Sequence, residues 1–145
     1  MPFERIVVGT DGSPDAEAAL AAATEIAAAD TTIHLVTAFD PPSESAVGRF
    51  IAALPLEFRD QHDPTSRSQE VLRKASSMVR DAGLAVVDHL VDAQPAEAIL
   101  DVADQIDADL IVVGCRAADE HDRFRRGSVS DKVVGATNRS ILVVQ

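Results

Sequence analysis

The chain has no tryptophan, no tyrosine and a single cysteine, Cys115, and its 24 acidic residues outnumber its 13 lysines and arginines. One cysteine excludes an intrachain disulfide and any metal site built from several cysteines. A net charge of −11 lacks the basic footprint that a nucleic-acid-binding surface requires. We therefore expect no nucleic-acid partner.

Long apolar runs are also missing. No stretch approaches the roughly 20 apolar residues that a membrane span needs. The first residues, Met-Pro-Phe-Glu-Arg, lack the basic-then-apolar pattern of a signal peptide. These absences predict a cytoplasmic protein with no membrane partner.

The charged residues have an unusual composition. Aspartate provides 16 of the acidic side chains and lysine only two of the basic ones. An aspartate-rich, lysine-poor surface resembles that of proteins from extreme halophiles, where molar salt shortens the Debye length to about 3 Å and screens self-repulsion. We therefore expect a halophilic source, and the charge indicates habitat rather than function.

Short apolar runs alternate with helical patterns along the chain. At 145 residues we expect one domain spanning 1–145. Strict alternation with helix-length crossovers predicts an α/β fold, an open, doubly wound parallel sheet with helices on both faces. The expected strands are 5–9, 32–39, 84–91, 109–114 and 140–144. The expected helices are 14–29, one from a Ser66/Gln69 capping box to Gly83, 96–106 and 128–135.

Two segments of this pattern bear on function. Residues 43–64 are the least patterned stretch and predict a functional lid or an insertion. The last strand is apolar throughout, so as an exposed edge it favours a symmetric homodimer through Ile141–Val144. A central or covered strand is the alternative.

The segment from Asp109 to Ser130 is the most informative. An apolar run ends at Gly114, a charged loop follows, and Gly127-Ser128 opens a helix. A buried strand that leads through a glycine-flanked loop into a helix N-terminus is suited to hold phosphate, because free backbone N–H groups and the helix dipole point into the loop.

The chain resembles the universal stress protein family over essentially its whole length. Five segments in the right order carry the resemblance: Ile6–Ser13, Pro95–Ile99, Ala108–Gly114, Gly127–Val133 and Ile141–Val144. The resemblance implies a flavodoxin-like (Rossmann-like) fold with strand order 3-2-1-4-5 and a homodimer formed through the last strand. Some members of the family bind ATP and others do not.

Members that bind ATP resemble the motif G-x-x-G-x9-G-S/T. The corresponding residues here are Gly114, Ala117, Gly127 and Ser128, so alanine replaces the second glycine while the spacing is kept. Alanine in a left-handed conformation costs roughly 1–2 kcal/mol, and an extra methyl group against a phosphate about 1–3 kcal/mol. Either cost weakens binding roughly 5- to 150-fold. The sequence also has Ala93 where a glycine is frequent, and 137–140 contains no proline where one is usual.

The resemblance implies a site for ATP or ADP, with Mg²⁺ as a companion ion. Asp11 would touch the adenosine, the backbone of Ala38 the adenine, and Ser128 and Ser130 the phosphates. The implied residues are Thr10, Asp11, Ala38, Val113, Gly114, Arg116, Ala117, Gly127, Ser128, Val129 and Ser130. A turn aspartate that bonds the backbone of Gly12 or Ser13 is the alternative for Asp11. The four arginines of the loop, beginning with Arg116, either contact phosphate or pair with its acidic residues.

Three other functions are alternatives to nucleotide binding. An enzyme would need a positioned base with a metal or an arginine clamp, and no Walker lysine motif accompanies Asp11. The four histidines fall on separate elements, and we expect strand or surface roles for them. A dimeric interaction module without nucleotide is favoured by the two lost glycines, and a flavin protein is disfavoured by the scarcity of aromatic residues.

Overall fold

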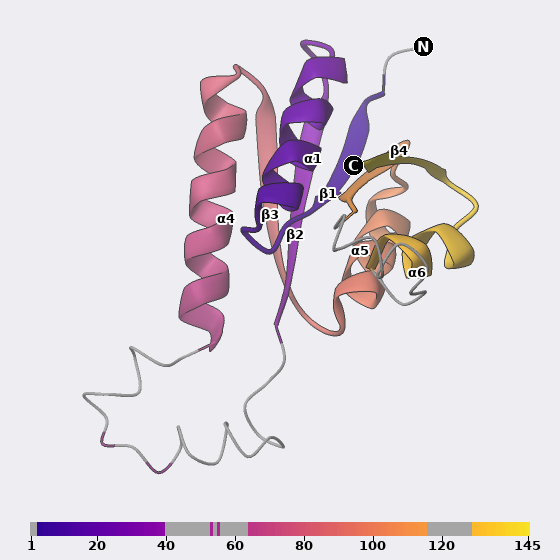
Figure 1. The fold of residues 1–145 in the computed structure, drawn as a ribbon. Coiled ribbons are helices and arrows are strands. Elements are labelled where there is room, and N and C mark those ends of the chain that lie inside the picture. The colour runs from indigo at the N-terminus through magenta and orange to yellow at the C-terminus, as the bar shows by residue number, and fades with distance from the viewer. Residues whose placement is uncertain (1–2, 40–52, 54, 56–63, 116–128) are drawn as a thin grey trace.

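The chain folds around one five-stranded parallel sheet in the order β3-β2-β1-β4-β5 (Figure 1). This is a computed structural model that describes residues 3–39, 53, 55, 64–115 and 129–145. The predicted doubly wound sheet and its strand order are confirmed. Among the described residues, no helix is long and apolar enough to cross a membrane.

β1 (Arg5–Gly9) and β4 (Leu110–Gly114) are neighbouring inner strands of five residues each, and both are largely buried. Both are runs of β-branched and leucine side chains, as expected of parallel strands covered on both faces. β2 (Thr32–Phe39) lies beside β1, and the two edge strands are β3 (Ala85–Asp92) and β5 (Ser140–Val144).

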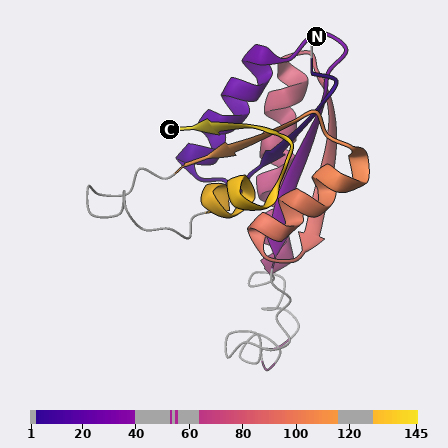
Figure 2. The ribbon, with the colours of Figure 1, turned by 90° about the vertical axis from the view of Figure 1, so that its right-hand side faces the viewer.

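Of the helices that the structure describes, two cover each face of the sheet (Figure 2). α1 (Pro14–Ile26) and α4 (Pro64–Asp81) pack on one face, and α5 (Pro95–Ile106) and α6 (Val129–Ala136) on the other. Alternate residues of each strand therefore enter two separate apolar cores, as the two-residue period of a strand requires.

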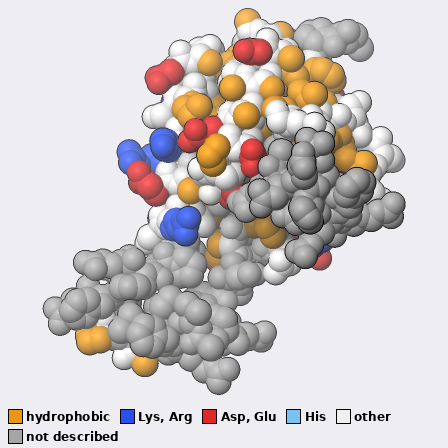
Figure 3. All heavy atoms as spheres, in the orientation of Figure 1, with side chains coloured by type: hydrophobic (Ala, Val, Ile, Leu, Met, Phe, Trp, Pro, Cys, Tyr) orange, Lys and Arg blue, Asp and Glu red, His pale blue; other side chains and the backbone are white. Residues whose placement is uncertain are grey.

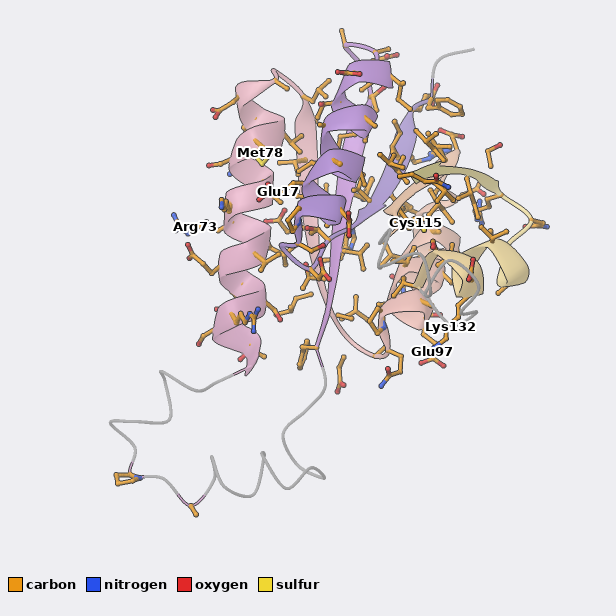
Figure 4. All side chains as sticks on the ribbon, in the orientation of Figure 1. Glu17, Arg73, Met78, Glu97, Cys115 and Lys132 are labelled. Carbon is orange, nitrogen blue, oxygen red and sulfur yellow. The ribbon has the colours of Figure 1, made fainter. Side chains whose placement is uncertain are left out.

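Small residues set how closely α1 lies on the sheet. Its inner face is formed by Ala16, Ala19, Leu20 and Ala23, all buried. Its start is as predicted, because the Ser13 side chain accepts the N–H of Ala16 at 3.3 Å and proline opens the first turn. On the side facing α4, Glu17 lies 3.8 Å from Lys74 (Figure 4).

The predicted capping box at Ser66 and Gln69 is wrong. The helix begins at Pro64, so both residues lie inside its first two turns. Proline suits the first turn because its missing N–H has no partner there in any helix. The helix ends as expected near Gly83, which has a φ of +79°. Basic side chains gather along α4, at the left edge of the molecule (Figure 3).

The other expected elements exist, with ends shifted by a few residues. α1 ends at Ile26 rather than residue 29, and α6 runs from Val129 to Ala136 rather than 128–135. β5 is an edge strand, so the alternative of a central position is excluded. Of residues 43–64, only 53, 55 and 64 are described, and the prediction of a lid falls outside them.

Two histidines that the sequence separates by 55 residues meet in the sheet. β2 and β3 pair in parallel with Val36 opposite His89, which brings His89 beside His34. The expectation of strand positions is correct for both. Their proximity followed from strand pairing, which no sequence spacing revealed.

The strand order also fixes where a ligand crevice forms. From β1 the chain crosses to β2 on one side, and from β3 it crosses back to β4 on the other. The direction of winding thus reverses between β1 and β4. In open α/β sheets the carboxyl ends of strands at such a point form the usual binding crevice.

A candidate ligand cavity at the carboxyl ends of β1 and β4

A cavity of about 350 Å³ lies at this reversal point. It is bounded by the ends of β1, β2 and β4 and by the first turns of α1, α5 and α6. The lining residues are Gly9, Thr10, Asp11, Ser13, Asp15, Ala16, Val36, Ala38, Pro95, Ile99, Val113, Gly114 and Val129. Its volume is that of a small-molecule site.

One side of the cavity is apolar. Val36, Ile99 and Val113 are almost fully buried, and Ala38 and Pro95 complete this wall. Ile99 also explains Gly9, because a Cβ built on Gly9 would lie 2.5 Å from the Ile99 Cδ1. Helix α5 therefore packs directly on the end of β1, and these apolar residues form an apolar slot along one side of the cavity.

The opposite side is the polar turn between β1 and α1. The N–H of Thr10 donates to the carbonyl of Val36 at 2.9 Å, and the hydroxyl of Thr37 donates to the carbonyl of Thr10 at 2.8 Å. The Asp11 carboxylate accepts the N–H of Ser13 at 2.9 Å. The local turn role foreseen for Asp11 is therefore present, and the exposed residue also lines the cavity.

Gly114 has a packing role at the mouth of the cavity. A Cβ built on it would collide with the backbone carbonyl of Asp15 in the first turn of α1. This glycine is thus required by the approach of α1 to β4. It is not by itself evidence of a phosphate contact.

The structure brings six of the eleven predicted site residues to this cavity: Thr10, Asp11, Ala38, Val113, Gly114 and Val129. Ser130 does not line it, since it is 2% exposed and lies inside the first turn of α6. The other four, Arg116, Ala117, Gly127 and Ser128, lie outside the described residues.

Sequence reasoning missed most of the apolar wall. Val36 and Ile99 read as ordinary core residues, and Pro95 as a helix start. The signal that identifies them is topological, because each stands at the end of β2 or the start of α5 once the strand order is fixed.

A second cavity of about 370 Å³ adjoins the first on the α4 side. The two share Asp11, Ser13 and Ala38, and the second adds Arg67 and Ser68 from α4. It is more polar and more open, so it extends the crevice away from the apolar slot.

The described residues that line the two cavities include no group of metal-ligating side chains. In the described part of the chain, no three histidine, cysteine, aspartate or glutamate side chains are grouped to hold a metal ion. Cys115 follows Gly114 at the end of β4 as a partly exposed free thiol (Figure 4). This edge of the sheet therefore forms a cavity lined by apolar side chains and by the backbone of the turn between β1 and α1.

The fold and the cavity together define a flavodoxin-like α/β protein with a small-molecule crevice at the sheet's switch point. Within that class, the model of the Universal stress protein family matches residues 2–145. The chain belongs to this family, and the resemblance drawn from the sequence is confirmed.

Individual relatives agree. The stress response protein NhaX of Bacillus subtilis is 30% identical, over 98% of each chain. A universal stress protein from Archaeoglobus fulgidus, solved in complex with dAMP, is 27% identical, with a TM-score of 0.70 and full coverage of both chains. Another universal stress protein, solved in complex with cAMP, is 26% identical with a TM-score of 0.70, over 99% of this chain and 98% of that one.

Proposed function

We propose that this protein binds adenine nucleotides, with the base in the apolar slot and the phosphates toward Gly114 and the start of α6. The cavity at the switch point supports this proposal, as do the dAMP and cAMP complexes of two relatives. The observation that carries it is the arrangement of the backbone at Ala38.

In a parallel strand, alternate residues direct their N–H and C=O groups to the same neighbour. The carbonyl of Val36 accepts the N–H of Thr10, so Val36 faces β1, and Ala38 two residues later faces the same way. β1 ends at Gly9, which pairs with Val36, and no residue of β1 lies opposite Ala38. The N–H and C=O of Ala38 are therefore directed to the cavity that Ala38 lines.

A neighbouring donor and acceptor suit adenine. Its amino group donates beside a ring nitrogen that accepts, whereas guanine carries a carbonyl acceptor in place of that amino group. A guanine in the same position would set two acceptors against each other, which leaves a buried polar group unsatisfied at a cost of about 1–3 kcal/mol. We therefore expect AMP to bind more tightly than GMP by about tenfold or more.

On the phosphate side the support is less direct. Val129 lines the cavity, so the first turn of α6 opens toward it, and a helix N-terminus favours anions. The family motif at Gly127 and Ser128 precedes this turn. The effect of Ala117 on phosphate binding decides whether the ligand is ATP, ADP or a monophosphate. We expect Mg²⁺ to bind only together with ATP or ADP.

The second candidate is a dimeric interaction module. The observation that favours it is β5, an edge strand whose residues Ile141–Val144 are all partly exposed. Pairing with a second copy along this edge would bury them and satisfy the free strand edge. We propose this homodimer alongside nucleotide binding. The two are compatible because no residue of β5 lines the cavity. A cytoplasmic location and the absence of nucleic-acid partners remain predictions.

Isothermal titration of the nucleotide-free protein with AMP, ATP and GMP tests the function. The variant Ala38→Leu fills the slot and should abolish binding of the adenine nucleotides. Ala18→Leu, on an exposed position of α1, is the matched control and should bind as the wild type does. Equal binding by the Ala38→Leu variant, or the same affinity for GMP and AMP, would contradict the proposed position of the base.

A further inference from the structure

His34 and His89 form an isolated imidazole pair between β2 and edge strand β3. His34 Nδ1 lies 3.0 Å from His89 Nε2, and the ring centres are 5.3 Å apart. The centre-to-centre distance equals the nitrogen–nitrogen distance plus roughly one ring radius at each end. The two nitrogens therefore point at each other along one line.

This head-on geometry distinguishes a hydrogen-bonded pair from a pair that chelates a metal ion. Two imidazoles that chelate a metal ion direct their lone pairs to a common point beside the line that joins the nitrogens. Here the lone pair of one nitrogen meets the other nitrogen directly, which is the geometry of an N–H···N hydrogen bond. The bond requires one nitrogen with a proton and one without.

The surroundings keep the pair largely uncharged. Burial, the neighbouring His89 and the Arg5 guanidinium on β1 lower the pKa of His34, in that order of size. Burial also lowers the pKa of His89, while the Asp88 carboxylate raises it. From α5 the buried residues are apolar, and its acidic residues Glu97, Asp101 and Asp104 are exposed.

β3 is an edge strand with one strand neighbour, and Val87, in register with His34, is 42% exposed. When both imidazoles are protonated, each facing nitrogen carries a hydrogen. An N–H then points at an N–H, and two positive charges lie at hydrogen-bond distance. The histidines would then push β3 away from β2 instead of holding it.

We propose that His34 and His89 form a pH-sensitive latch that holds β3 to the sheet while at least one imidazole is neutral, and that opens when both are protonated. The latch also bears on the candidate cavity. Ala38 pairs with Val91 of β3, and β3 leads through a short turn to Pro95, so two residues of the apolar slot are positioned by this strand. An open latch should therefore weaken nucleotide binding. This second part rests on the proposed function.

Amide hydrogen exchange of β3 at several pH values between about 7.5 and about 5 tests the latch. After correction for intrinsic rates and reference to β4, exchange in the wild type should rise by up to tenfold per pH unit once the second proton is taken up. His89→Gln keeps an amide nitrogen near the Nε2 position but cannot become charged, so two positive charges never face each other and its β3 exchange should change little with pH. His34→Asn mimics Nδ1 in the same way, and exchange in β4 is the internal control in each protein.

Equal pH slopes in the wild type and in both non-titrating variants would overturn the latch. So would an NMR titration of the wild type in which both imidazoles become protonated without faster β3 exchange. This second measurement needs no variant.

The regulatory part has its own readout in the affinity for AMP. Its dissociation constant should rise on acidification more steeply in the wild type than in His89→Gln. The same pH dependence in both proteins would overturn the regulation and leave nucleotide binding intact. No AMP binding at any pH would overturn the proposed function together with the regulation, while the exchange data still decide the latch.

Discussion

Gly114 and Asp15 meet backbone to backbone, with the carbonyl oxygen of Asp15 in the space that a Cβ of residue 114 would occupy. This contact joins the end of β4 to the first turn of α1 and sets one border of the cavity. A glycine that belongs to a family's nucleotide motif is thus needed for the fold as well. Substitution at this position therefore cannot serve as a clean test of ligand binding.

Gly114→Ala should destabilise the protein by about 1–3 kcal/mol, as overpacking against rigid backbone does. Urea unfolding measures it. Gly135→Ala is the control, because it lies in α6 with nothing within 4 Å of its added Cβ, and alanine is the better helix former by about 0.5–1 kcal/mol. A Gly114→Ala protein as stable as the wild type would show that α1 withdraws freely from β4.

Asp109 ties the start of β4 to the start of β1. One carboxylate oxygen accepts the N–H groups of Glu4 and Arg5, both at 2.9 Å. Asp109→Ala should cost about 1–3 kcal/mol, at the low end because water reaches these exposed groups. Asp109→Asn retains an acceptor oxygen and should lose less than half as much. Equal losses in urea unfolding would mean that the negative charge, rather than the hydrogen bonds, matters.

Arg139 stands in the turn before β5 and contacts the C-terminus of α5. Its guanidinium donates to the Asp107 carboxylate and to the carbonyl of Ala108, both at 2.9 Å. Asp107 ends α5 in a left-handed conformation, with a φ of 53°. The Arg139 side chain thus holds an uncommon backbone conformation at the C-terminus of α5.

The pH dependence of Arg139→Ala should reveal this interaction. Hydrogen bonding to Arg139 lowers the pKa of Asp107 below its ordinary 3.8. Because the folded pKa is lowered, the pair stabilises the fold above about pH 4 and the contribution is lost as pH falls through the folded pKa. Urea midpoints of wild type and variant should therefore differ at about pH 7 and approach each other as pH falls below 3.8. A constant difference would assign the effect to packing.

Ala117→Gly restores the second glycine of the motif G-x-x-G-x9-G-S/T that the sequence resembles. The methyl group of Ala117 weakens binding if it occupies space that a phosphate needs, or if the bound protein requires a left-handed conformation at this residue. In either case the glycine variant should bind ATP about 5- to 150-fold more tightly. Adenosine, which lacks phosphates, is the control ligand and should bind both proteins equally. A matching gain for adenosine would place the effect of Ala117 away from the phosphates.

The sequence predicted the fold closely because each element carries a local signal. The β-branched runs at Ile6–Val8 and Ile111–Val113 mark buried strands, and Ser13-Pro14 marks a helix start. The strand order itself came from family resemblance. The capping box at Ser66 failed because a proline two residues earlier already opens the helix.

Contacts between distant segments were beyond local reasoning. The collision that keeps residue 114 a glycine involves a residue 99 positions earlier, and the imidazole pair depends on the register of β2 against β3. Val36 and Ile99 became cavity residues only when strand order placed the ends of β2 and α5 around one point. Such relations depend on three-dimensional packing, which the linear pattern of apolar residues leaves undetermined.

The central claim is tested most directly by the nucleotide content of the purified protein. The protein is purified in high salt and denatured, and the released small molecules are separated by ion-exchange chromatography. We predict an adenine nucleotide in an amount comparable to that of the protein, or, after its removal, saturable binding of added AMP or Mg·ATP by calorimetry. An empty protein that gives no heat with either nucleotide would contradict nucleotide binding and leave the dimeric interaction module as the better description.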